Sequence, residues 1–122
     1  MAKRILLIED DQFTRELYED VFKAAGYDIE SAPDGEVGLT KAREGGYDLI
    51  LLDVMMPKLD GLGVLKGLKQ SPPEKQNGSI VLLTNLAHDP VVKEAMANGA
   101  KASLVKADFN TDELVERVKT FL

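Results

Sequence analysis

Short, uninterrupted runs of apolar residues recur along this chain, and stretches with a helical pattern separate them. The three clearest runs are residues 5–8 (ILLI), 49–52 (LILL) and 80–83 (IVLL). A strand that is apolar at every position is typical of a parallel sheet with helices on both faces. Weaker runs at 28–32 and 102–105 bring the expected number of strands to five.

The segment after the first run has the pattern of a helix. Phe13, Leu17, Val21 and Ala25 recur every four residues and predict one apolar helix face. Gly26 follows them, at a place where a left-handed residue commonly ends a helix.

Two later helices have recognisable first residues. Asp89 is expected to cap a helix that begins at Pro90 and ends before Gly99. Asn110 and Glu113 have the spacing of a capping box at the start of the last helix.

Alternation of strand and helix along the whole chain predicts the fold class. A weaker helical pattern at 35–44 and a polar, proline-rich loop at 71–79 fit the same scheme. We expect an α/β fold, (βα)5, with a doubly wound, parallel five-stranded sheet and right-handed crossovers. The chain has 122 residues, the usual size of one domain, so we expect residues 1–122 to form a single domain.

Composition excludes several kinds of function. The formal net charge of −6 disfavours nonspecific binding to nucleic acid, and the absence of cysteine rules out disulfides and thiolate metal sites. No apolar run approaches the roughly 20 residues that cross a bilayer, and the N-terminus lacks a signal-peptide pattern. We therefore expect a cytoplasmic protein that does not insert into membranes.

Reactive side chains stand where four of the five strands end. Glu9 and Asp10 follow the first strand, Asp53 the third, Thr84 the fourth and Lys106 the fifth. The second strand ends without such a residue, which places it at the sheet edge in the flavodoxin-like order 2-1-3-4-5. Adjacent strands lie about 4.8 Å apart, so these side chains are expected to share one small space.

Carboxylates this close repel one another, and a divalent cation removes the conflict. A few hard oxygen ligands suit Mg²⁺, or Mn²⁺ in its place, better than zinc. The Lys106 ammonium and the Thr84 hydroxyl are suited to phosphoryl oxygens, and a carboxylate such as Asp53 is able to accept a phosphoryl group. The pattern thus predicts phosphoryl transfer.

The chain resembles the receiver domains of two-component response regulators over essentially its whole length. The matching motifs are IEDD at 8–11, LLDVMMP at 51–57, DG at 60–61, Thr84 and Lys106. The resemblance implies that Asp53 is the phosphoacceptor and that Thr84 and Lys106 bind the phosphoryl oxygens. It also implies four metal ligands: Glu9 mainly through water, Asp10, Asp53, and the backbone carbonyl of Met55.

The same resemblance implies partners. The phosphoryl donor is expected to be a phosphohistidine of a sensor histidine kinase or of a histidine phosphotransfer protein, and small acyl phosphates are expected to substitute. A receiver domain is a phosphoacceptor with its own Mg²⁺-dependent chemistry rather than an ordinary enzyme. A stand-alone receiver signals through a downstream protein, usually on the face formed by the fourth helix, fifth strand and fifth helix, as a monomer or a phosphorylation-dependent dimer.

Several positions depart from the usual receiver pattern. Ser103 replaces a common aromatic residue, so we expect a signal to pass through backbone shifts. Ala107 replaces the proline that usually follows the lysine, and we therefore expect a trans bond there. Met55 and Leu86 are apolar where polar side chains orient the hydrolytic water, which predicts slow self-dephosphorylation.

Other interpretations of the pattern are open. A flavin- or nucleotide-binding module is disfavoured by the acidic residues after the first strand, and a phosphatase by the lack of a second carboxylate at Met55. A receiver-fold interaction domain that works independently of phosphorylation is the main alternative. We expect Asp11 to cap the first helix and His88 to lie in an exposed loop.

Overall fold

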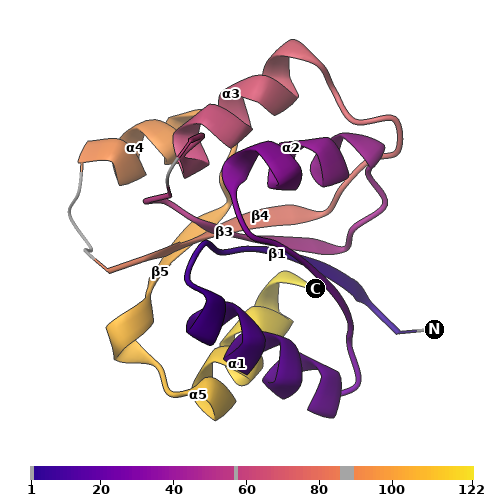
Figure 1. Cartoon of the computed structure of the whole chain (residues 1–122), viewed down its shortest axis with the longest axis vertical. Helices are drawn as coiled ribbons and strands as arrows, with labels where there is room; N and C mark the ends of the chain where they lie inside the picture. The colour runs from indigo at the N-terminus through magenta and orange to yellow at the C-terminus, as the bar shows by residue number, and fades with distance from the viewer. Residues whose placement is uncertain (1, 57, 86–89) are drawn as a thin grey trace.

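The computed structural model of the chain describes residues 2–56, 58–85 and 90–122, and its elements alternate as the sequence predicts (Figure 1). The strands and helices are β1 (Arg4–Ile8), α1 (Gln12–Ala24), β2 (Asp28–Ala32), α2 (Gly35–Glu44), β3 (Leu49–Asp53), α3 (Gly61–Gln70), β4 (Ser79–Thr84), α4 (Pro90–Ala97), β5 (Ala102–Val105) and α5 (Thr111–Val118). Short 3₁₀ turns follow β5 at Lys106–Asp108 and α5 at Lys119–Phe121.

The five strands form one parallel sheet in the order β2-β1-β3-β4-β5. All four neighbouring pairs are parallel, and β1 and β3 pair from Ile5↔Leu49 to Ile8↔Leu52. The predicted fold class and strand order are confirmed. The order makes the ends of β1 and β3 neighbours at the centre of the sheet.

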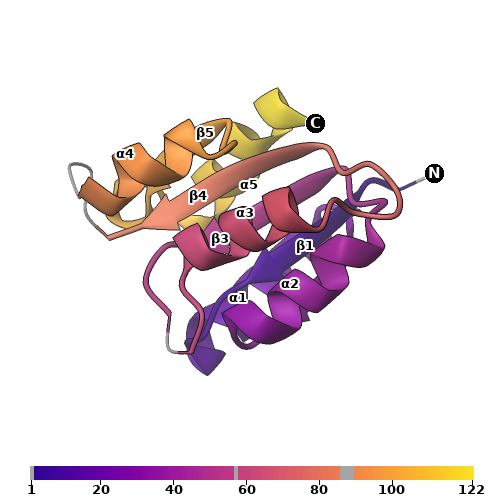
Figure 2. The same ribbon diagram turned by 90° about the horizontal axis from the view of Figure 1, so that it is seen from above.

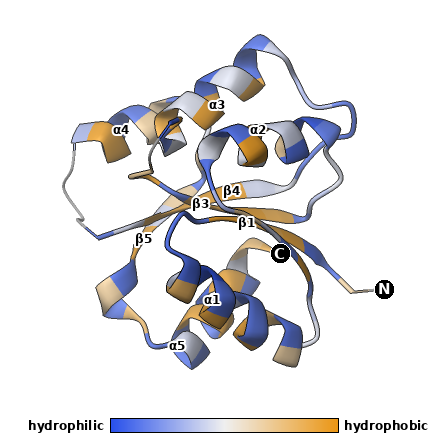
Figure 3. Cartoon of the chain, in the orientation of Figure 1, coloured by the Kyte–Doolittle hydropathy of each residue, from blue (hydrophilic) through white to orange (hydrophobic). Residues whose placement is uncertain are grey.

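Two apolar cores lie on opposite faces of this sheet, because alternate strand residues point to opposite sides. Leu6, Ile50 and Leu82 pack beneath α2, α3 and α4, whereas Ile5, Leu49 and other residues face α1 and α5. Figure 1 shows the two helical layers on opposite sides of the sheet, and Figure 2 looks onto the layer of α2, α3 and α4. Figure 3 shows the apolar strands between the two layers. Burial on both faces explains why the strand sequences are continuous rather than alternating.

Side-chain caps begin the helices. Asp11 accepts a hydrogen bond from the Thr14 N–H at 2.8 Å and caps α1, as predicted. Asn110 and Glu113 form the predicted capping box of α5. The expected α4 cap, Asp89, lies outside the described residues.

The predicted apolar face of α1 is wrong. Phe13 is 76% exposed and Leu17 is 40% exposed, and the helix instead buries Tyr18 and Phe22. A helix turns about 100° per residue, so Phe13 lies roughly 140° around the axis from Tyr18. A row of residues four apart also drifts around the helix, and of this row only Val21 packs against the core.

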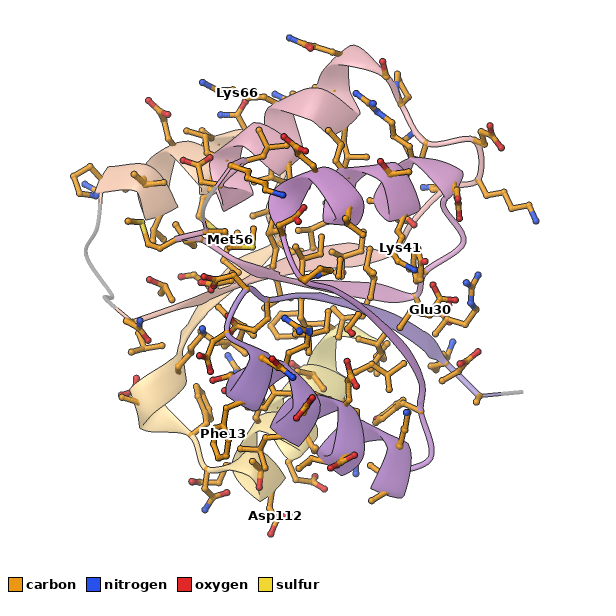
Figure 4. The ribbon with its side chains drawn as sticks, in the orientation of Figure 1. Phe13, Glu30, Lys41, Met56, Lys66 and Asp112 are labelled. Atoms are coloured by element: carbon orange, nitrogen blue, oxygen red, sulfur yellow. The ribbon has the colours of Figure 1, made fainter. Side chains whose placement is uncertain are left out.

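A polar network joins β2 to the start of β3 near the sheet edge. The Tyr47 hydroxyl donates to Glu30 Oε2 at 2.6 Å, and the Arg4 guanidinium lies 3.3 Å from Glu30 Oε1. Lys41 approaches the same carboxylate at 3.8 Å (Figure 4). The Tyr47 hydrogen bond, supported by the two cations, lowers the pKa of Glu30, although partial burial opposes the shift.

Within the described part of the chain, no helix combines the length and the apolar character needed to cross a bilayer.

Candidate functional site

The carboxyl ends of β1 and β3 bring three carboxylates together. Glu9, Asp10 and Asp53 each offer an oxygen atom, and these atoms lie within 4.8 Å of one another. Glu9 is 1% exposed and Asp53 is 5% exposed, whereas Asp10 is open to solvent. Two buried carboxylates and one accessible carboxylate therefore form a crowded, all-oxygen cluster.

Lys106 reaches this cluster from the end of β5. Its Nζ lies 2.5 Å from Glu9 Oε1 and 3.4 Å from Asp53 Oδ2. Burial lowers the pKa of Lys106, but the contacts with Glu9 and Asp53 outweigh burial and raise the pKa. Lys106 is thus held as a cation between the two buried carboxylates.

Burial and a neighbouring carboxylate raise the pKa of Asp53. Burial is the first cause that raises the pKa of Asp53, Glu9 is the second, and the nearby Lys106 opposes both. The result is a pKa of about 7. One lysine does not compensate the carboxylates fully, so the cluster favours further positive charge.

Met55 and Thr84 border Asp53. The Met55 N–H donates to Asp53 Oδ1 at 3.3 Å, and the Met55 side chain is 62% exposed. Thr84 ends the adjacent strand β4 and is buried, one residue after the partner of Asp53 in the β3–β4 pair. Met55 thus contacts the Asp53 carboxylate, and Thr84 follows the strand position that pairs with Asp53.

The loop after Asp53 packs tightly against the start of α2. The Gly61 N–H donates to the Val54 carbonyl at 3.0 Å, and a Cβ at Gly35 would lie only 1.9 Å from the Leu59 carbonyl oxygen. The Lys58 ammonium lies 3.7 Å from the Asp34 carboxylate. This loop therefore needs glycine at Gly35 to keep its position.

Sequence analysis missed Arg15, which lies one turn into α1. Its Nη1 donates to the Glu9 carbonyl at 3.0 Å and to the Asp10 carbonyl at 3.4 Å. Helical side chains tilt toward the helix N-terminus, so an arginine at this distance from the acidic residues was the available signal.

The donor set fits Mg²⁺. The cluster contains only oxygen ligands, and Asp10 leaves it open on one side, which suits an ion that keeps several waters. Three carboxylates face one lysine in this cluster, so it carries a net negative charge that a cation would offset. Glu9, Asp10 and Asp53 are the side chains able to hold such an ion.

The structure brings Glu9, Asp10, Asp53 and Lys106 together, and no cis peptide bond occurs among the described residues, in agreement with the trans bond expected at Ala107. Other expectations fall on Pro57, Leu86 and His88, which lie outside the described residues. The metal contact expected from the Met55 carbonyl stays a prediction.

The chain matches a known protein family and known structures. The family model for the response regulator receiver domain matches residues 5–119. The chemotaxis protein CheY of Bacillus subtilis is 30% identical over 123 residues, covering 100% of this chain and 99% of CheY. A crystal structure of the Thermotoga maritima response regulator TrrA in complex with Mg²⁺ and BeF is 38% identical, with a TM-score of 0.81 over 98% of this chain and 99% of TrrA.

Several relatives are much longer than this chain. The gliding motility regulatory protein of Myxococcus xanthus is 35% identical over 115 residues, which are 94% of this chain and 15% of that protein. The chain spans 48% of another relative, a transcriptional regulatory protein of Bacillus subtilis.

Proposed function

This chain belongs to the response regulator receiver domain family, and we propose that it is a phosphorylation-dependent switch in which Asp53 accepts the phosphoryl group. The observation that supports the proposal most strongly is the position of Asp53. Its buried carboxylate lies beside Glu9 and Asp10 and 3.4 Å from the Lys106 ammonium. The proposed nucleophile thus has one cation beside it and two further carboxylates that are able to hold a metal ion.

The chemistry assigned to this site is transfer from a phosphohistidine or from a small acyl phosphate. A carboxylate oxygen of Asp53 forms a bond to phosphorus while the bond from phosphorus to the donor nitrogen or oxygen breaks, and the donor leaves with that electron pair. Lys106 stabilises the negative charge of the transferred group, and the Thr84 hydroxyl donates a hydrogen bond to a phosphoryl oxygen. Such a reaction depends mainly on positioning and charge stabilisation.

We assign the metal contacts to Glu9 through water, to Asp10 and Asp53 directly, and to the Met55 backbone carbonyl. The bound Mg²⁺ supplies positive charge that offsets the carboxylates and the incoming phosphoryl oxygens, and Mn²⁺ is expected to replace it. Support for this assignment comes from the three carboxylate oxygens within 4.8 Å of one another.

The proposed partners follow from the family. The donor is a sensor histidine kinase or a histidine phosphotransfer protein, and the output is binding to a downstream protein through the face formed by α4, β5 and α5. We treat residues 1–122 as one receiver domain in the cytoplasm, without direct contact to nucleic acid. Phosphorylation-dependent dimerisation belongs to the same proposal.

Intact mass spectrometry after incubation with Mg²⁺ and acetyl phosphate tests the acceptor. We expect the wild type to gain one phosphoryl group and Asp53→Ala to gain none. Asp112→Ala is the matched control, because Asp112 is an exposed carboxylate on α5 and its loss leaves the site intact.

Absence of phosphorylation in the folded wild type would instead favour the alternative, an interaction domain that works independently of phosphate. One observation favours that alternative: Ser103, in the middle of β5, offers no aromatic side chain to move in response to phosphorylation. Phosphorylation that persists in Asp53→Ala would overturn the assigned acceptor.

A further inference from the structure

Arg15 holds the backbone at the point where the β1 ladder ends. The pairs of β1 with β2 and β3 both finish at Ile8, so the carbonyls of Glu9 and Asp10 lie beyond the sheet. Arg15 Nη1 donates to these carbonyls at 3.0 Å and 3.4 Å. One guanidinium therefore joins α1 to two consecutive peptide groups of the acidic segment.

Two charge effects oppose one another at Arg15: the nearby carboxylates of the acidic segment attract a cation, whereas the helix dipole repels it. The first turn of a helix carries the positive end of the helix dipole, and a cation there is unfavourable by a few tenths of a kcal/mol or more. Arg15 is also half-buried, which restricts its hydration. The two carbonyl contacts are directional, so they point to a role that depends on geometry as well as on charge.

The two carboxylates beyond β1 are fixed to different degrees. Glu9 is buried, pairs with Lys106, and accepts a hydrogen bond from the Asp11 N–H at 3.2 Å. Asp10 is exposed, so packing does not fix its backbone. Arg15 contacts the carbonyls of the two peptide groups that flank the Asp10 Cα, and these contacts set the direction in which the Asp10 side chain leaves the backbone.

We infer that Arg15 is a positioning residue that orients the Glu9–Asp10 segment for binding of a divalent cation. The inference rests on the proposed function, because the cation is the Mg²⁺ assigned there. Arg15 acts through the backbone carbonyls and does not contact the ion. Residues that orient metal ligands commonly change metal affinity by about 10–100-fold when they are removed.

Positioning and simple electrostatics predict opposite signs for the same substitution. Arg15 carries a positive charge next to a cation site, so its removal strengthens Mg²⁺ binding if charge is the only effect. If the carbonyl contacts dominate, removal weakens binding although the site becomes more negative. The sign of the change in affinity therefore separates the two explanations.

The experiment is isothermal titration of Mg²⁺ into protein freed of metal with EDTA and then dialysed against metal-free buffer. Arg15→Ala is expected to raise the dissociation constant about tenfold. Arg15→Lys keeps the charge but loses the planar fork, and its dissociation constant should fall between those of the wild type and Arg15→Ala. Lys23→Ala, which removes an exposed charge at the far end of α1, should match the wild type.

Urea unfolding without metal shows whether each variant is folded before it is titrated. Tighter or unchanged Mg²⁺ binding by folded Arg15→Ala would overturn the inference and leave the proposed function intact. Equal affinities of Arg15→Lys and the wild type would also overturn it, because charge would then be sufficient. A wild type that binds no Mg²⁺ would overturn both the inference and the assigned metal site.

Discussion

Substitution of Gly35 by alanine should disturb the loop that follows the proposed phosphoacceptor. The new Cβ would lie 1.9 Å from the Leu59 carbonyl oxygen, about 1.5 Å closer than the 3.4 Å at which ordinary contact begins. The atom in the way belongs to the backbone, so a change of side-chain rotamer gives no relief. Overpacking that moves backbone costs about 1–3 kcal/mol, and we expect Gly35→Ala to lose about 2 kcal/mol of unfolding free energy.

Gly63→Ala is the matched control, because its Cβ meets the same residue in a different way. The nearest atom is Leu59 Cδ1 at 2.4 Å, at the end of a flexible side chain. Rotation of Leu59 relieves the contact, and alanine inside α3 gains roughly 0.5–1 kcal/mol over glycine. Gly63→Ala should therefore be within about 1 kcal/mol of the wild type.

Urea unfolding followed by circular dichroism compares the three proteins, and acetyl phosphate labelling follows the rate at Asp53. We expect Gly35→Ala alone to lose stability and to be labelled more slowly, because Leu59 lies in the loop that follows Asp53. A Gly35→Ala protein as stable as Gly63→Ala would refute the steric reasoning.

Three further perturbations test the charges and the site. In EDTA at pH 8, Asp53→Asn should be more stable than the wild type by about 2 kcal/mol. The pKa of Asp53 is raised from 3.8 to about 7, so the folded wild type loses stability as the pH rises through that range, and the whole loss is present at pH 8. Urea unfolding without such a gain contradicts the burial of Asp53 and its crowding by Glu9. Tyr47→Phe should cost about 1 kcal/mol at pH 7. The pKa of Glu30 is lowered from 4.5, so the difference in unfolding free energy between Tyr47→Phe and the wild type should shrink as the pH falls below 4.5 and Glu30 takes up a proton. A difference that does not change with pH argues against the Tyr47 hydrogen bond. Met55→Asn should shorten the lifetime of the phosphorylated protein severalfold in a mass-spectrometric decay assay, because the new amide is able to orient the hydrolytic water. An unchanged lifetime contradicts the assigned role of this position.

The fold was predictable because its signals are local. Continuous apolar runs located the strands, and the weak runs at 28–32 and 102–105 coincide with β2 and β5. The capping box at Asn110 located the start of α5 in the same way. The strand order followed from one further argument, the absence of a reactive side chain at the end of the second strand.

The sequence predicted only those parts of the site that follow from the strand order. That order places Glu9 and Asp53 together, but sequence alone does not reveal the 2.5 Å contact of Glu9 with Lys106, because it depends on the length and direction of a lysine side chain. The face of α1 was wrong because a four-residue row drifts around the helix and leaves Phe13 exposed. The role of Arg15 was missed because its partners are backbone carbonyls, which no motif marks, and only its spacing from Glu9 and Asp10 indicated the contact.

The ion pair between Glu9 and Lys106 joins residues 97 positions apart, from the ends of the first and last strands. Closing a loop of this length is entropically costly and belongs to the slow, non-local part of folding. A chain that has formed only its first four strands holds the carboxylates but not the lysine. The proposed phosphoryl chemistry is therefore tied to completion of the sheet, and a ligand that needs the whole cluster stabilises the fully folded chain over its partly folded states.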